Sequence, residues 1–137
     1  MKTHVAAILI FSAVVGAERY TPTDAERARW TMSDMRSLAT AIEDYAKDNK
    51  TYPAVKSIEE LIPLIQPIYI RKAPTPDAWG HAYTYVPSAD AQSYRLISSG
   101  ADGKTDPASW EKAGPLTSFD EDAVFDSGSM TRPWPFN

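Results

Sequence analysis

Acidic residues gather in the last third of this sequence, in an arrangement that could bind a cation. Seven carboxylates and two lysines lie between Ser99 and Gly128, which gives this segment a net charge of −5 (2 − 7). Hard divalent cations such as Ca²⁺ take about six to eight oxygen ligands from carboxylates and carbonyls, and flexible loops rich in Gly and Asp supply both. From composition alone, however, a solvated acidic loop is the simpler interpretation and is favoured.

The spacing of these acids differs from that of an EF-hand. Lys104 stands where an EF-hand loop has Asp or Asn, and no glycine occupies the sixth position of that loop. Backbone carbonyls from Leu96 to Gly100 and at Thr117 could complete a site of another kind. The candidate side-chain ligands are Asp102, Asp106, Asp120, Glu121, Asp122 and Asp126.

The groups that most enzymes use are scarce. His81 is the one histidine beyond residue 17, and the chain has no cysteine. Transition-metal sites built from His and Cys are therefore excluded by supply. No nucleophile elbow, phosphate-binding loop or His-Glu-x-x-His motif is present. We expect no catalytic residue, and a hydrolase that uses paired carboxylates is the weakest alternative.

The tetrad Asp77-Ala78-Trp79-Gly80 has the composition of a turn. An Asp side chain can accept hydrogen bonds from nearby amides, and Gly tolerates positive φ. Trp79 can cover the edge of a sheet. We interpret the tetrad as structural rather than functional.

The N-terminus has the pattern of a secretory signal peptide. Lys2 and His4 precede an apolar run from Val5 to Val15, and Val15-Gly16-Ala17 resembles a cleavage site. The run is about half the ~20 residues that a membrane-spanning helix needs. We therefore expect residues 1–17 to be a signal peptide and residues 18–137 to form one exported domain, in the periplasm or on the surface of a bacterium. A cleaved chain has a net charge of −5, which disfavours nucleic-acid binding.

Two helices are expected before any strand. Thr23 and Glu26 can form a capping box, or Thr21 can cap the helix with Pro22 in its first turn. Apolar residues then recur at steps of three and four as far as Asp48. Ser57 and Glu60 repeat the capping pattern and predict a short helix from Ile58 to about Leu64. The stripe of the long helix comprises Ala28, Met32, Met35, Leu38, Ala39, Ile42, Tyr45 and Ala46.

Strands follow the helices and should pack on them. His81–Val86 and Ser93–Ser98 are aromatic and β-branched runs that predict an antiparallel hairpin. A third short strand is possible near Val124-Phe125, and the remainder of Gly100–Asn137 is predicted as one long loop. The order of elements predicts an α+β domain: a long amphipathic helix on a small antiparallel sheet, with an acidic C-terminal loop.

Four segments, in this order, resemble the globular part of type II secretion major pseudopilins. They are MSDMRSLATAIEDYAKDNKTYP, YIRKAPTPDAWGHAYTYV, YRLISSGADGKTDP and DEDAVF. The similarity runs from Met32 to Phe125, with Ala78 in place of the proline that the family has in its D-P-W-G turn. It implies a pilin-like head that is not an enzyme, and partners that are subunits of the secretion apparatus or copies of the same chain.

The resemblance also implies a calcium ion in the loop after the hairpin, and this makes calcium the favoured interpretation. Asp102, Asp120 and Asp122 match the acidic ligands of the family best, and Ser99 lies among the carbonyl contributors. Asp106 and Glu121 match less directly, because the segment between the two acidic clusters has no dependable register.

The resemblance does not extend to the N-terminus. A pseudopilin begins with a short basic leader, a cleavage site followed by Phe, a Glu at the fifth mature position and ~20 apolar residues that anchor it. The apolar run Val5–Val15 lacks that Glu and is shorter. We therefore expect an exported relative of the head without the usual membrane-spanning helix.

A second function remains open from sequence: a free-standing secreted binding module that has kept the fold and lost filament assembly. Its ligand surface would be an aromatic patch for a peptide or glycan, whereas the simpler interpretation places these aromatics in the core. The patch would consist of Trp110, Trp134, Phe136, Tyr83 and Tyr85.

Overall fold

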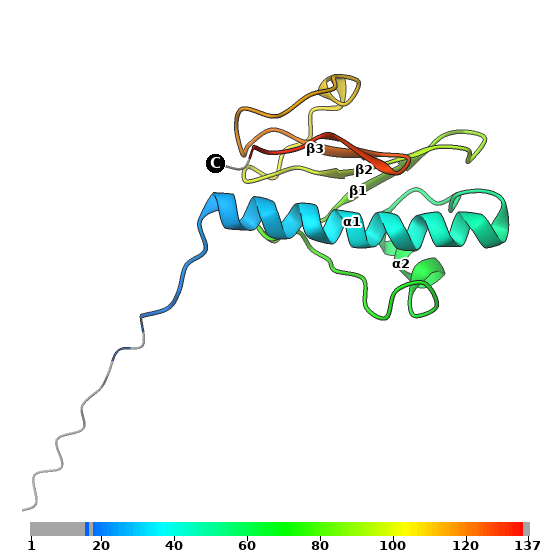
Figure 1. Ribbon diagram of the computed structural model, residues 1–137, viewed down its shortest axis with the longest axis horizontal. Helices are drawn as coiled ribbons and strands as arrows, with labels where there is room; N and C mark the ends of the chain where they lie inside the picture. Colours follow the sequence, from blue (N-terminus) through cyan, green and yellow to red (C-terminus); the bar gives the residue numbers. More distant parts are fainter. Residues whose placement is uncertain (1–15, 17, 136–137) are drawn as a thin grey trace, which may run out of the picture.

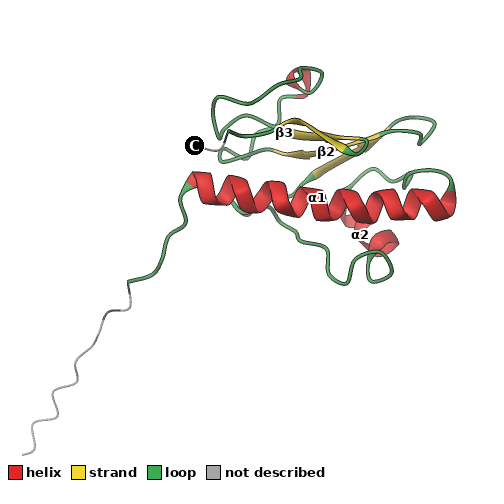
Figure 2. Cartoon of the chain, viewed as in Figure 1, coloured by secondary structure: helices red, strands yellow, loops and turns green. Residues whose placement is uncertain are grey.

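The computed structural model describes Gly16 and residues 18–135, so the predicted signal peptide lies outside the described residues apart from Gly16. A long helix α1 (Asp24–Asn49) and a short helix α2 (Ile58–Ile65) precede a sheet of four strands. The strands are β1 (Thr84–Pro87), β2 (Tyr94–Ser98), β3 (Ala123–Asp126) and β4 (Ser129–Arg132), with a 3₁₀ turn η1 (Pro107–Ser109) between β2 and β3. Figure 1 shows α1 running along one face of the sheet, and Figure 2 shows the same chain by type of structure. The predicted α+β class is confirmed.

The start and end of α1 follow from local chemistry. Thr23 accepts a hydrogen bond from the Glu26 amide, and the Glu26 carboxylate accepts one from the Thr23 amide, so the helix begins with the capping box and not at Thr21. Lys50 ends the helix in a left-handed conformation, with φ 66°. The predicted stripe is buried from Ala28 to Ile42, whereas Tyr45 and Ala46 are half-buried. Full burial of each large apolar side chain contributes about 1.5–3 kcal/mol.

Helix α2 lies beside α1 and contacts β1. Ser57 caps it by accepting from the Glu60 amide, as predicted, but the Glu60 carboxylate accepts from the Lys56 amide rather than from that of Ser57. Pro63 lies inside the helix, which ends one residue beyond the predicted Leu64. Leu61 and Ile65 fill the core below α1.

The four strands form an antiparallel sheet in the order β1-β2-β3-β4. Leu96 pairs with Phe125 and both join the core under α1. Side chains alternate between the faces of a strand, so the neighbouring pair, Ile97 and Val124, points to the opposite face. Both of these side chains are fully buried, which means that the outer face of the sheet is also covered.

The prediction of one long loop from Gly100 to Asn137 is wrong in its second half. Strand β4 pairs with β3 through the tight turn at Ser127 and Gly128, both of which have positive φ. Its sequence, Ser-Met-Thr-Arg, has one large apolar residue and therefore gives little strand signal. The remaining loop forms the layer on the outer face of the sheet, above the strands in Figure 1.

Candidate functional site

Two groups of acids, Asp102 with Asp106 and Asp120–Asp122, come together where the outer layer begins. The Ala101 amide donates to the Phe119 carbonyl over 2.8 Å, which joins the end of β2 to the segment that leads into β3. Gly100 lies between them with φ +69°, and a Cβ there would stand 2.2 Å from the Phe119 carbonyl oxygen. Only glycine allows this approach, because both the conformation and the space exclude a side chain.

An open hollow of about 340 Å³ lies next to this junction, and we call it the acidic hollow. Its lining contains five carboxylates and three cations, a local charge of −2 (3 − 5). The carboxylates are Asp102, Asp106, Asp120, Glu121 and Asp122, and the cations are Lys104, Lys112 and Arg132. Five of the six ligands that the resemblance implies therefore line one hollow. Ser99 and Asp126 do not line it: Ser99 is buried in the protein, and Asp126 pairs with Arg95 at 3.0 Å on the outer face of the sheet.

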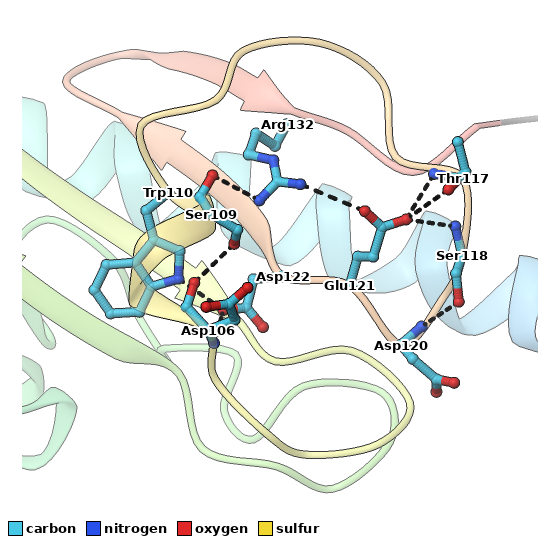
Figure 3. A network of polar contacts seen from close by, with 9 residues as sticks. All are labelled: Asp106, Ser109, Trp110, Thr117, Ser118, Asp120, Glu121, Asp122 and Arg132. Atoms are coloured by element: carbon cyan, nitrogen blue, oxygen red, sulfur yellow. Dashed lines mark hydrogen bonds and ion pairs between the residues drawn. The ribbon is translucent and has the colours of Figure 1, made fainter.

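Asp122 is the most buried of these carboxylates, with an exposed fraction of 2%. Its Oδ2 atom accepts hydrogen bonds from the Asp106 amide and from the Trp110 indole Nε1, both over 2.7 Å. A buried carboxylate is costly unless donors satisfy it, and these two donors meet that need on one oxygen. Asp122 directly precedes β3, so these two hydrogen bonds connect the residues on both sides of η1, Asp106 and Trp110, to the start of that strand (Figure 3).

Glu121 is held from two sides. Its Oε1 atom accepts from the Thr117 amide, the Thr117 hydroxyl and the Ser118 amide, each over 2.9 Å. Its Oε2 atom lies 3.5 Å from a guanidinium nitrogen of Arg132. The Thr117 amide and hydroxyl, with smaller help from Ser118 and Arg132, lower the pKa of the Glu121 carboxyl below its ordinary value.

The other three predicted ligands are differently placed. Asp102, Asp106 and Asp120 are exposed. Asp102 accepts one hydrogen bond, from the Lys104 amide, over 2.9 Å. Within residues 18–135, no hydrogen bond reaches the carboxylates of Asp106 and Asp120, whose backbone groups alone are engaged. In the described part of the chain, no three His, Asp or Glu side chains lie close enough together to hold a metal ion.

Arg132 was not anticipated as a part of this site. It is buried, with an exposed fraction of 6%, and donates to the Ser109 carbonyl over 2.8 Å as well as approaching Glu121. The sequence offered no signal for it, because its place in the hollow depends on strand β4, which was predicted as loop. Figure 3 shows the guanidinium between Ser109 and Glu121.

The Asp77 turn is structural, as predicted, and it supports the same junction. Asp77 accepts from the Trp79 and His81 amides and from the Ser98 hydroxyl, the last over 2.7 Å. The His81 Nδ1 atom lies 2.8 Å from the Gly100 carbonyl, so Nδ1–H is the donor in this pair. The turn and the only described histidine thus fix the end of β2 where the acidic hollow begins.

The predicted aromatic patch does not form a surface. Tyr83, Tyr85 and Trp134 are buried in the core, with exposed fractions of 1–3%. Trp110 is half-buried against Asp122, and Phe136 lies outside the described residues. The simpler interpretation, that these aromatics pack the interior, is confirmed for the three core residues.

No helix between residues 18 and 135 combines the length and the apolar character that a bilayer span requires.

Comparison with known proteins identifies the family to which this sequence is similar. The sequence matches the family described as type II secretion system (T2SS), protein G over residues 20–112, which is more than half of its 137 residues.

Two relatives carry the name type II secretion system core protein G. That of Pseudomonas aeruginosa PAO1 is 29% identical over 106 residues, which cover 69% of this chain and 74% of the relative. That of Escherichia coli K12 is 32% identical over 84 residues, which cover 53% of this chain and only 57% of the relative. No solved structure matches the chain. The chain belongs to the type II secretion system protein G family, the major pseudopilins, whose members are structural and not enzymatic.

Proposed function

We propose that residues 18–137 act as an exported pseudopilin-like head that works in or beside a type II secretion apparatus through contacts with its subunits or with further copies of itself. The family match, over most of the described residues, is the observation that carries this proposal. The family belongs to the bacterial cell envelope; the periplasm or the cell surface is the proposed location within it. The long helix would serve as the spine and the sheet with its outer layer as the contact surface.

The competing function, a free-standing binding module, finds less support. It required an aromatic ligand surface, and three of its five residues are core residues. With these three aromatics in the interior, the head would make its contacts through other, exposed side chains.

Purification from the envelope of the native bacterium tests the main proposal. A tagged full chain, cross-linked in the cell and purified under denaturing conditions, should bring with it subunits of the type II secretion apparatus or a ladder of its own copies. An unrelated exported protein with the same tag serves as the control. Recovery of the chain as an uncross-linked monomer, in cells that actively secrete, would contradict the proposal.

We further propose that the acidic loop binds a calcium ion. The oxygen donors of the acidic hollow suit a hard divalent cation, and the hollow keeps an excess of negative charge after its three cations are counted. Asp102, Asp106 and Asp120 are exposed and could turn toward an ion, with Glu121, Asp122 and the Ser99 carbonyl as the remaining candidates from the family resemblance.

Calcium binding predicts a stabilisation by mass action. A ligand that binds only the folded state adds about 2.7 kcal/mol at a concentration 100 times its dissociation constant, so the Tm should rise with Ca²⁺ and fall with a chelator. Asp102→Ala should remove the response. Asp90→Ala, a carboxylate change in the β1–β2 turn, should leave it intact. Identical melting curves in Ca²⁺ and chelator, or an undiminished response in Asp102→Ala, would exclude this loop as the site.

A further inference from the structure

We propose that the open edge of strand β1 binds the extended segment that precedes α1 in a second copy of this chain. We call this segment, residues 18–23, the arm. The inference rests on the proposed function and deepens it, because it names two surfaces through which copies of the head would meet. Neither surface includes a residue that lines the acidic hollow.

The two edges of the sheet differ in how they are covered. Strands β1 and β4 are the outer strands. At the β4 edge the Gly114 amide donates to the Thr131 carbonyl, and the Leu116 amide donates to the Pro133 carbonyl just beyond the strand, each over 2.9 Å. Among the described residues, no backbone group bonds to the outward side of β1. An uncovered edge of this kind can pair with a further strand.

The register of β1 shows which of its groups point outward. The Ser88 amide donates to the Ser93 carbonyl, and bonded positions alternate along an antiparallel strand. Val86 therefore bonds to β2, whereas Tyr85 and Pro87 direct their backbone groups away from the sheet. Because proline has no N–H, the edge offers one donor, at Tyr85, and two acceptors.

A groove of about 360 Å³ lies beside this edge, and we call it the edge groove. It is formed by β1, the start of the β1–β2 turn and the segment between α1 and α2. A second hollow of about 240 Å³ lies on the outer face of the sheet, next to the half-exposed Val86. A strand added to β1 would direct alternate side chains toward these two hollows. The apolar lining of the edge groove comprises Ala54, Val55, Tyr85, Val86, Pro87 and Ala89.

The arm is an extended segment with few contacts. Its residues are exposed apart from the half-buried Pro22, and the Tyr20 side chain is 69% exposed. Figure 1 shows the arm leading away from the body of the domain. The Tyr20 hydroxyl donates to one carboxylate oxygen of Glu26, whereas the Thr23 amide uses the other oxygen. Release of Tyr20 would therefore leave the capping box of α1 intact.

The side chains of the arm match the chemistry of the edge groove. Glu18 and Tyr20 are two residues apart, so they lie on the same face of an extended chain. Tyr20 would enter the apolar groove, and Glu18 would approach Lys56, which lines the groove and forms no ion pair within residues 18–135. Pro22 has no N–H and would end the pairing after four residues, which is the length of β1.

The length of the arm requires that its partner be another copy. Six extended residues span at most about 20 Å. The 26 residues of α1 span about 39 Å, and the arm begins at the N-terminal end of this helix. The edge groove is lined by residues 54–56, which follow the C-terminal end of α1 closely. The arm therefore cannot reach the groove of its own chain. A contact between two different surfaces is heterologous and can add one copy after another.

Cross-linking of the full chain, exported and purified from the periplasm of an expressing bacterium, tests this contact. The sequence has no cysteine, so an introduced cysteine reports one position. Arg19→Cys and Val86→Cys chains, mixed and treated with a short bis-maleimide, should give mainly the product that joins the two variants. Ser37→Cys, exposed in the middle of α1, replaces Val86→Cys as the matched control and should lose this product.

Tyr20→Ser tests the arm without affecting the folded domain. Loss of the buried aromatic ring should weaken self-association, measured by sedimentation, by roughly 10-fold or more. The Tm should stay unchanged, because Tyr20 is exposed in the single chain. Arg19→Ser, whose side chain would point to the opposite face of the arm, should leave self-association nearly unchanged.

Each result supports or overturns the inference. Equal cross-linking of Arg19→Cys to Val86→Cys and to Ser37→Cys would overturn it, as would undiminished self-association of Tyr20→Ser. If Val86→Cys is joined in the cell to a different protein, the edge has another occupant and the arm is not its ligand.

Failure of the proposed function gives a different pattern. Arm-to-edge cross-links between purified copies, with an uncross-linked monomer recovered from secreting cells, would support the contact and contradict the function. Recovery of secretion subunits with a chain that is monomeric when pure would support the function and overturn the contact.

Discussion

Gly100 and Asp77 show how single residues build the acidic hollow. Asp77 gathers three donors around the end of β2. Gly100 follows that end directly and lets the chain pass close to the Phe119 carbonyl. The Asp77 turn was predictable, because Asp and Gly within four residues are typical of a turn. The need for glycine at position 100 was not, because the atoms that exclude a side chain there come from another part of the chain.

Gly100→Ala should destabilise the protein strongly. The new Cβ would meet backbone atoms, Phe119 O at 2.2 Å and Glu121 O at 3.0 Å, and the φ of +69° would add strain. A left-handed residue costs about 1–3 kcal/mol and overpacking a similar amount, so we expect a loss of about 2–6 kcal/mol in the free energy of unfolding by urea.

Gly80→Ala is the control for this change. Gly80 has φ +88°, but no atom lies within 4 Å of a Cβ at that position. Only the conformational term of about 1–3 kcal/mol applies there. Equal losses in the two variants would show that Phe119 and Glu121 do not crowd Gly100.

At the scale of elements, the helices were predicted well and the sheet only in part. The caps of α1 and α2 are local signals, since the bonding partners are three residues apart. Strands β1 to β3 were placed within a few residues, but β4 was not found. A strand of four mostly polar residues is defined by its partner, and the partner of β4 is specified by the turn at Ser127 and Gly128.

The end of α1 offers a stabilising substitution. Lys50 adopts φ 66° at the C-cap, a conformation that glycine takes without the cost of about 1–2 kcal/mol that other residues bear. Lys50→Gly should therefore raise the free energy of unfolding by about 0.5–1 kcal/mol, after the greater entropy of glycine in the unfolded chain is allowed for. Urea denaturation measures the change.

Arg36→Gly provides the comparison for Lys50→Gly. Arg36 is exposed in the middle of α1, where glycine costs about 1 kcal/mol. The two substitutions of a basic residue by glycine should thus have opposite signs. A loss of stability in Lys50→Gly would mean that the left-handed cap is not populated in solution.

At the scale of the whole molecule, three buried tyrosines make the stability depend on pH in the alkaline range. Burial raises the pKa of the Tyr83, Tyr85 and Tyr94 phenols far above the ordinary value of 10.0. The unfolded chain can ionise them above about pH 10 and the folded chain cannot. Stability from these groups is complete below that pH and is lost as the pH rises further.

Glu121 affects stability at acid pH. Its pKa is lower in the folded protein than its ordinary value of 4.5, so its contribution to stability is present above pH 4.5 and is lost as the pH falls.

Two conservative substitutions separate burial from hydrogen bonding. Tyr85 donates to the Pro53 carbonyl over 2.8 Å, whereas the Tyr83 hydroxyl is buried without a partner among the described residues. Tyr83→Phe should keep or slightly raise stability at neutral pH, and Tyr85→Phe should lose about 1 kcal/mol. Both should make the loss of stability above about pH 10 shallower, as measured by urea denaturation at a series of pH values. An equal loss at neutral pH would show that the Tyr83 hydroxyl has a partner in solution.

The sequence by itself determined the helices, the hairpin, the turn at Asp77 and the family, because each depends on residues that are close together in the chain or on motifs in a fixed order. It also identified the acids that line one hollow. Only the tertiary structure decided their roles: the long-range pairing of β3 with β2 and β4 places Asp122 under the Trp110 indole, Glu121 beside Arg132, and Asp102 and Asp120 in water. These carboxylates are chemically alike but differ in burial and in the hydrogen-bond donors around them. Both properties depend on tertiary contacts, so the spacing of the residues along the chain does not predict them.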